Sequence, residues 1–242
     1  IVWRVRLLAL RCLNHCLSWV YKYPRFRNGH KTIYFVGHDR SGSSWISGML
    51  GKADNTLYVY EPINADASYL GDFSLYNTYL APGQRSNRHE AIFDIASSGF
   101  GTQIVPFYKI GLKLFSNPTI VIKEVGGMLL GEWFQDRYGG KVVLLTRHPA
   151  PVIFSNIKMA QSNAEDWLKA MRADSAVYGE LLSCYDFKSL DEADIVTKFA
   201  IVYCIRYLMA FSQLQRNSGW VQVKYENFCV NPALEFERLF GV

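Results

Sequence analysis

The chain has 242 residues, of which half are apolar and 19% are charged, so it suits one α/β domain with a large core and not a disordered protein. Its net charge of +5 is local, because residues 1–31 carry seven Lys or Arg and no acid, against 19 basic and 21 acidic residues in the rest. This uneven distribution excludes a general nucleic-acid surface, and no nucleic-acid partner is expected.

The first predicted unit is a basic amphipathic helix or arm over residues 1–28, and one domain follows over 29–242. Arg4, Arg6 and Arg11 interrupt the apolar run before it reaches the ~20 residues that a membrane span needs. A basic helix over 1–22 predicts either peripheral contact with an anionic membrane surface or packing on its own domain. We expect the domain to be truncated at its C-terminus, because no closing signal follows Phe240.

An apolar strand from Ile33 runs through a glycine-bearing turn into a helix over Trp45–Leu50. From Gly37 to Gly42 the turn has the spacing of the phosphate loop G-x-x-x-x-G-K-[ST], with serine in place of the lysine. Such a turn aims backbone N–H groups and the positive helix end at one anion. Because Arg40 stands inside the loop, we expect a phosphate or sulfate ester there. The alternative is a glycine turn with an exposed arginine.

A second strand, Thr56–Tyr60, leads into Glu61. A carboxylate at the carboxyl edge of a parallel sheet lies where open α/β folds keep their sites, so Glu61 is either a general base or a solvated turn acid. Residues 63–101 form the least regular part, with aromatic residues among Asn, Asp, Ser and Gly. This part is either the acceptor pocket or a partly ordered surface excursion.

A helix over Thr102–Phe115 precedes a buried strand over Pro118–Glu124, which places Lys123 at the same sheet edge. A helix over Gly127–Tyr138 then leads to a central parallel strand over Lys141–Thr146. Arg147 follows that strand where a nucleotide triphosphatase usually has the aspartate that holds magnesium. With Ser155, near the start of the helix opened by Pro151, Arg147 predicts a second anion site; taken singly it could merely cap the strand.

The remaining chain carries no predicted chemistry. Residues 163–216 are mainly helical with core-like aromatic spacing, Val221–Glu226 is a last strand, and Asn231–Phe240 begins another helix. The alternation of strands and helices predicts an α/β, three-layer P-loop-type fold with a central parallel sheet flanked by helices.

Taken together, these motifs resemble the sulfotransferase superfamily. They are the Arg-Ser-Gly-Ser-Ser loop, Tyr-Glu-Pro, the Arg-x-Pro strand end with serine eight residues on, and the late Lys-Tyr-Glu-Asn-Phe. The resemblance extends from about Thr32 to Val242 and is closest to the carbohydrate and tyrosylprotein branches. It implies 3′-phosphoadenosine 5′-phosphosulfate as co-substrate, a hydroxyl-bearing acceptor, most of all a carbohydrate, and no metal.

The resemblance also implies roles for individual residues. Glu61 would take the acceptor proton, Arg40 would stabilise the transferring sulfonate, and Lys123 would assist at the bridging oxygen. The residues expected to bind the donor are Arg40, Ser41, Gly42, Ser43, Ser44 and Trp45 at the 5′-phosphosulfate, and Arg147 and Ser155 at the 3′-phosphate.

Three positions depart from the family pattern. His38-Asp39 precede Arg40 where proline is frequent, His148 replaces the usual aspartate, and Lys224 stands for an arginine. Asp39 is the most awkward of these, since a carboxylate beside a bound anion would repel it unless it points away.

Two other functions fit parts of the sequence. A magnesium-dependent kinase of phosphate-loop type would use the same turn, and a non-catalytic module could bind a nucleotide or a membrane. For location we expect the cytoplasm, with membrane association through the basic arm or a Golgi luminal domain as alternatives. The five cysteines have no paired C-x-x-C spacing and indicate neither a metal site nor a disulfide scaffold. Their odd number fits a reducing compartment.

Overall fold

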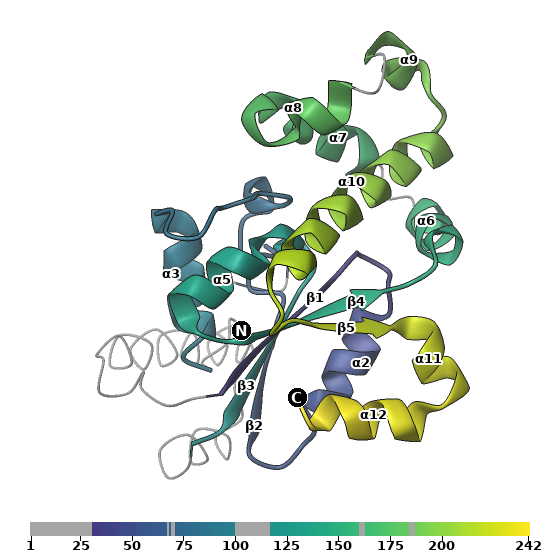
Figure 1. Ribbon diagram of the computed structural model, residues 1–242. Helices are drawn as coiled ribbons and strands as arrows, with labels where there is room; N and C mark the ends of the chain where they lie inside the picture. The colour runs from purple at the N-terminus through teal and green to yellow at the C-terminus, as the bar shows by residue number, and fades with distance from the viewer. Residues whose placement is uncertain (1–30, 67, 69–70, 100–116, 160–162, 184–186) are drawn as a thin grey trace, which may run out of the picture.

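The computed structural model describes residues 31–66, 68, 71–99, 117–159, 163–183 and 187–242. These residues form a parallel sheet with the strand order β2-β3-β1-β4-β5 (Figure 1). The strands are β1 (Thr32–Gly37), β2 (Thr56–Tyr60), β3 (Thr119–Glu124), β4 (Lys141–Thr146) and β5 (Val221–Lys224). The predicted α/β fold with a central parallel sheet is therefore confirmed.

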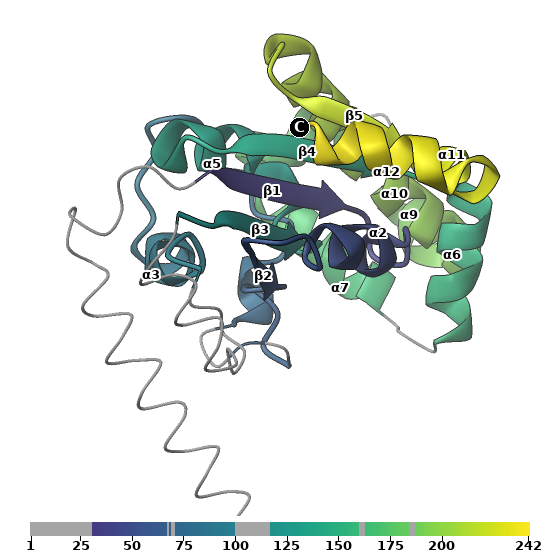
Figure 2. The same cartoon turned by 90° about the horizontal axis from the view of Figure 1, so that it is seen from below.

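Helices cover both faces of the sheet, which gives three layers (Figures 1 and 2). The helices are α2 (Ser43–Leu50), α3 (Asn87–Ala96), α5 (Gly131–Tyr138), α6 (Pro149–Lys158), α7 (Asn163–Ala173), α8 (Ser175–Ser183), α9 (Phe187–Glu192), α10 (Ile195–Arg216), α11 (Tyr225–Val230) and α12 (Pro232–Phe240). Two short 3₁₀ turns, η2 (Phe73–Leu75) and η3 (Met128–Leu130), complete the described elements.

The sheet is buried on both faces, which explains why its strands are continuously apolar. Alternate residues of β1 belong to two cores. Tyr34 belongs to the core that also contains residues of α3, α5, α7 and α10, whereas Phe35 belongs to the core that also contains residues of α2, α11 and α12. The Tyr34 ring stacks on Phe134 of α5 with 4.3 Å between centroids, and its hydroxyl donates to the Gly127 carbonyl at 2.8 Å. The central strand is thus held rigidly, and its carboxyl end is a fixed platform for the loop that follows.

The strand order places that loop at the switch point of the sheet. β3 and β4 lie on opposite sides of β1, so the connections after β1 and β4 leave in different directions. Ligands of open α/β proteins bind in the crevice outside the carboxyl ends of the strands at such a point.

Several predicted boundaries were wrong. Residues 63–101 are not irregular throughout, because α3 lies within them. The helix predicted from Gly127 begins at Gly131 after a 3₁₀ turn, and β5 ends at Lys224 because α11 starts at once. The arm over 1–28 and the helix predicted over 102–115 lie outside the described residues.

One helix in the described part of the chain, α10, is long and apolar enough to cross a membrane by length and composition. In this fold α10 packs on α6 and α7, and 44% of its most apolar window is buried inside the protein. Its composition is compatible with membrane association, but the buried face already serves the domain core.

Candidate active site at the carboxyl edge of the sheet

The loop after β1 turns sharply into α2. Gly42 is the N-cap of α2 with φ +88°, and Arg40 also has a left-handed backbone with φ +63°. No side chain caps the helix, so the backbone N–H groups of Ser43 and Ser44 at its start have no side-chain acceptor from the cap residue. The predicted strand-to-helix turn is therefore present, and α2 begins at Ser43, two residues before the predicted helix start. Anion binding at this turn stays a prediction.

The two predicted anion sites meet in space. Arg40 Nε donates to Ser155 Oγ at 3.0 Å, and Arg147 Nη1 donates to the Arg40 carbonyl at 3.0 Å. The Arg147 guanidinium lies 4.1 Å above the Tyr225 ring, which orients it without consuming its donors. Its Nε has no partner among the described residues. α6 begins at Pro149 and not Pro151, which places Ser155 in its second turn.

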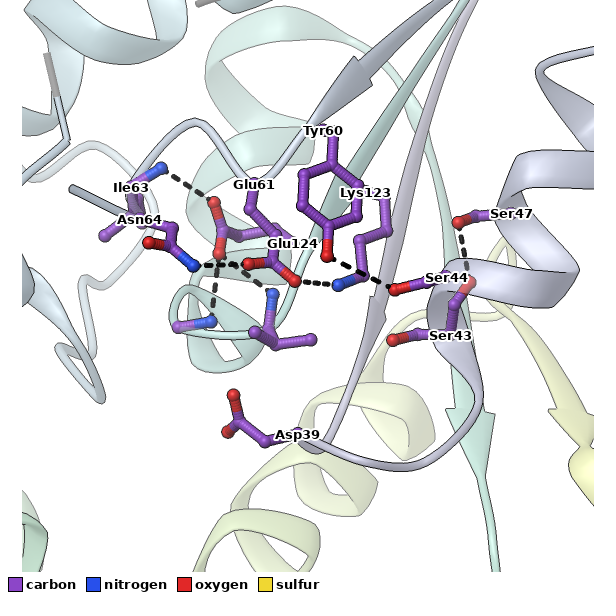
Figure 3. Close-up of polar contacts among 12 residues, drawn as sticks. Asp39, Ser43, Ser44, Ser47, Tyr60, Glu61, Ile63, Asn64, Lys123 and Glu124 are labelled. Atoms are coloured by element: carbon purple, nitrogen blue, oxygen red, sulfur yellow. Dashed lines mark hydrogen bonds and ion pairs between the residues drawn. The ribbon is translucent and has the colours of Figure 1, made fainter. Parts of the chain in front are cut away.

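Glu61 and Lys123 form a buried ion pair across neighbouring strands (Figure 3). The pairing of β2 with β3 sets Tyr60 opposite Lys123, so the residue after Tyr60 meets the lysine side chain. Glu61 Oε2 accepts from Asn64 Nδ2 at 2.6 Å, and its backbone, with φ +42°, donates to the Lys123 carbonyl at 2.7 Å. Glu61 is therefore a held carboxylate at the sheet edge, and not a solvated turn acid.

Tyr60 joins this ion pair to the loop after β1. Lys123 Nζ lies 4.6 Å from the centroid of the Tyr60 ring, and the Tyr60 hydroxyl is 3.4 Å from Ser44 Oγ (Figure 3). Tyr60 therefore contacts both Ser44 of the loop and Lys123 of the ion pair.

Glu124 holds together the connections that follow β2 and β3, next to this ion pair, and sequence reasoning missed it. Its Oε1 accepts from the backbone N–H groups of Val125 and Gly126, and its Oε2 accepts from that of Ile63, each at 2.9 Å (Figure 3). Burial raises the pKa of Glu124 to about 7, and the hydrogen bonds from the Ile63 and Val125 N–H groups oppose that change only in part. The carboxyl group ties the connection after β2 to the connection after β3.

A cavity of about 460 Å³ opens between these groups, within the range of ligand sites. Of the predicted site residues, all but Ser41 line it: Arg40, Gly42, Ser43, Ser44, Trp45, Glu61, Lys123, Arg147 and Ser155. Ser41 is buried beneath the loop, and its hydroxyl has no partner in the described part of the chain. Tyr60, Asn64, Val125 and Asp39 complete the lining.

The negative charge of Asp39, in the loop after β1, is balanced by a neighbouring cation. Its Oδ2 is 2.8 Å from Nη1 of Arg206, a fully buried residue of α10 to which the sequence had assigned no chemistry. Burial is the largest single effect and raises the pKa of Asp39, but the charge and hydrogen bond of Arg206 together with the charges of His38 and Lys123 outweigh it, and the resulting pKa lies below the usual value. Asp39 is therefore an ionised, paired carboxylate.

His38 is buried between the loop and α10, where it packs against Tyr203 with 5.4 Å between ring centroids. Burial, reinforced by the charge of Arg206, lowers the pKa of His38 to about 3. Unfolding restores the ordinary value of about 6.5, so below that pH the unfolded chain binds a proton that the folded chain excludes. Stability contributed by the neutral ring is present above pH 6.5 and is lost as the pH falls towards 3.

We expect His38→Phe, which keeps an aromatic ring, to remove this dependence. Between pH 7.5 and pH 5 the wild type should lose about 2 kcal/mol more of its unfolding free energy than the variant. Urea unfolding of both proteins at the two pH values measures the difference. Equal losses would show that folding does not lower the pKa of His38.

The comparison with known proteins adds no assignment. No protein-family model and no curated protein matches the chain.

Proposed function

We propose that this chain is a sulfotransferase that moves a sulfuryl group from 3′-phosphoadenosine 5′-phosphosulfate to an acceptor hydroxyl. One observation carries the proposal: Arg40, Arg147 and the Glu61–Lys123 pair surround the same cavity at the switch point of the sheet. Arg40 and Arg147 are suited to bind anions, and the Glu61–Lys123 pair is suited to transfer a proton beside the bound anion. The Arg147 Nε, which has no partner among the described residues, also fits a ligand rich in acceptor oxygens.

In the proposed reaction, different residues of the cavity bind the two ends of the donor. The loop N–H groups, Ser43 and Ser44 bind the 5′-phosphosulfate, and Arg147 with Ser155 binds the 3′-phosphate. Glu61 takes the proton of the acceptor hydroxyl while that oxygen forms a bond to sulfur. The bond from sulfur to the bridging oxygen breaks, and the electron pair leaves with adenosine 3′,5′-bisphosphate.

The protein's cations act where negative charge develops. Arg40 faces the sulfonate from the loop, and Lys123 lies at the end of β3 beside the base, from which it can reach the bridging oxygen. Lys123 is held by Glu61 and by the Tyr60 ring, so its position is set before a ligand binds. Such preorganisation suits stabilisation of a transition state.

The acceptor is proposed to be a carbohydrate. Around Glu61 the cavity presents the Tyr60 ring and the Asn64 amide, which suit the faces and hydroxyl groups of a sugar. For location we propose the cytoplasm, supported by Cys204 and Cys229, which are free and exposed as in reducing compartments.

Calorimetric binding of adenosine 3′,5′-bisphosphate tests the donor site. We expect binding without metal, in preference to ATP with magnesium. Arg147→Ala should weaken it about 10- to 100-fold, because each hydrogen bond to a charged group contributes about 1.5–3 kcal/mol. Lys141→Ala is the matched control, since Lys141 is exposed at the opposite end of β4. Preference for ATP with magnesium would overturn the proposal.

A further inference from the structure

Arg206 is a fully buried cation near the cavity, although it does not line it. It lies in the middle of α10 with 1% of its surface exposed. Its Nη1 bonds Asp39 Oδ2 at 2.8 Å, its Nη2 bonds the Val125 carbonyl, and its guanidinium lies 5.7 Å from the centroid of the Trp167 ring. A buried guanidinium costs free energy to desolvate, so its partners must recover that cost.

The two partners of Arg206 belong to the two halves of the site. Asp39 precedes Arg40 in the anion loop after β1, and Val125 follows Lys123 and Glu124 after β3; both line the cavity. One planar group therefore fixes the distance between the donor side and the side that carries the ion pair.

Charge gives Arg206 a second effect. The Asp39 carboxylate lines the same cavity as Arg40, and its low-dielectric surroundings would strengthen its repulsion of a bound anion. With Arg206 in place, its positive charge balances the Asp39 carboxylate. The charge of Arg40 then leaves the loop with a net positive charge. Without Arg206, the Asp39 charge would cancel that of Arg40.

We propose that Arg206 is a positioning residue for anion binding, which acts by neutralising Asp39 and by joining the loop after β1 to the connection after β3. The inference rests on the proposed function only in that the ligand of the loop is an anion.

A charge cycle tests it with adenosine 3′,5′-bisphosphate and, separately, inorganic sulfate as probes. Arg206→Gln should weaken binding of the bisphosphate about tenfold or more, and adding Asp39→Asn to that variant should restore affinity to within about threefold of wild type. Asp39→Asn alone should bind at least as tightly as wild type. Arg216→Gln is the control, because Arg216 is another arginine of α10 that pairs with an acid, Glu132 of α5, but it does not line the cavity.

The outcomes separate the two proposals. A folded double variant that binds no better than Arg206→Gln would reduce Arg206 to structural support and overturn this inference alone. If Arg206→Gln does not fold, Arg206→Lys and the double variant carry the test, and a tenfold loss in both would overturn it. A wild type that binds neither probe would overturn the proposed function together with this inference.

Discussion

Glu61→Gln is expected to lower the rate of sulfuryl transfer by about 10²- to 10⁴-fold, the range that a positioned general base contributes. The amide has nearly the shape of the carboxylate but cannot accept the acceptor proton. Because Glu61 follows β2 and Arg147 follows β4, with β3 and β1 between them in the sheet, affinity for adenosine 3′,5′-bisphosphate should stay within about threefold of wild type. The measurement is bisphosphate release from the sulfated donor in the presence of an oligosaccharide panel.

Because Glu61 is paired with the buried Lys123, a second variant is needed to separate loss of the base from loss of stability. In Glu61→Gln the Lys123 ammonium remains buried beside an uncharged amide, which costs about 3–5 kcal/mol of stability. Glu61→Gln combined with Lys123→Met removes both charges, so it should regain stability while turnover stays lost. Turnover that persists in folded Glu61→Gln would exclude this carboxylate as the base.

The sheet and its carboxyl edge were predictable because the strands have a clear sequence pattern. β1, β3 and β4 are continuous apolar runs, and each is followed within a few residues by a polar or charged group. The contact between Glu61 and Lys123 was not predictable in the same way. It requires β2 to pair with β3 in the register that sets Tyr60 opposite Lys123, and a single sequence does not state which strands are neighbours.

The burial of Arg206 could have been predicted from the sequence. The buried stripe of α10 runs through Phe199, Val202, Arg206, Ala210 and Gln213, which follow helical spacing. A lone arginine in the centre of such a stripe must find a buried anion. Its sequence position does not reveal that the anion is Asp39, 167 residues away.

The missed helix α3 has a similar explanation. The Ser86 N–H donates to the Glu90 carboxylate at 3.1 Å, a variant of the capping box one residue longer than usual, so the standard spacing did not find it. Ile92, Phe93 and Ala96 then give the apolar face of the helix. Polar residues around this face made the whole segment resemble a loop.

Gly42→Ala is expected to damage both the loop and the anion site. At φ +88° an L-residue is strained by about 1–2 kcal/mol, and the added Cβ would lie 2.3 Å from Cε2 of the Tyr225 ring. That ring supports the Arg147 guanidinium, so relief of the clash must displace Arg147, the loop, or both. We expect a loss of about 2–4 kcal/mol in unfolding free energy and at least about a tenfold loss in affinity for the bisphosphate.

Gly83→Ala separates backbone strain from the clash. Gly83 also has a left-handed backbone, with φ +76°, but a Cβ there would meet nothing within 4 Å, and Gly83 does not line the cavity. This control should lose about 1 kcal/mol of stability from strain and no bisphosphate affinity. Because both variants place alanine in left-handed backbone, any further effect of Gly42→Ala measures the fit of the loop against Tyr225. Bisphosphate affinity unchanged by Gly42→Ala would mean that the anion binds away from this turn, and the two arginines would then need another explanation.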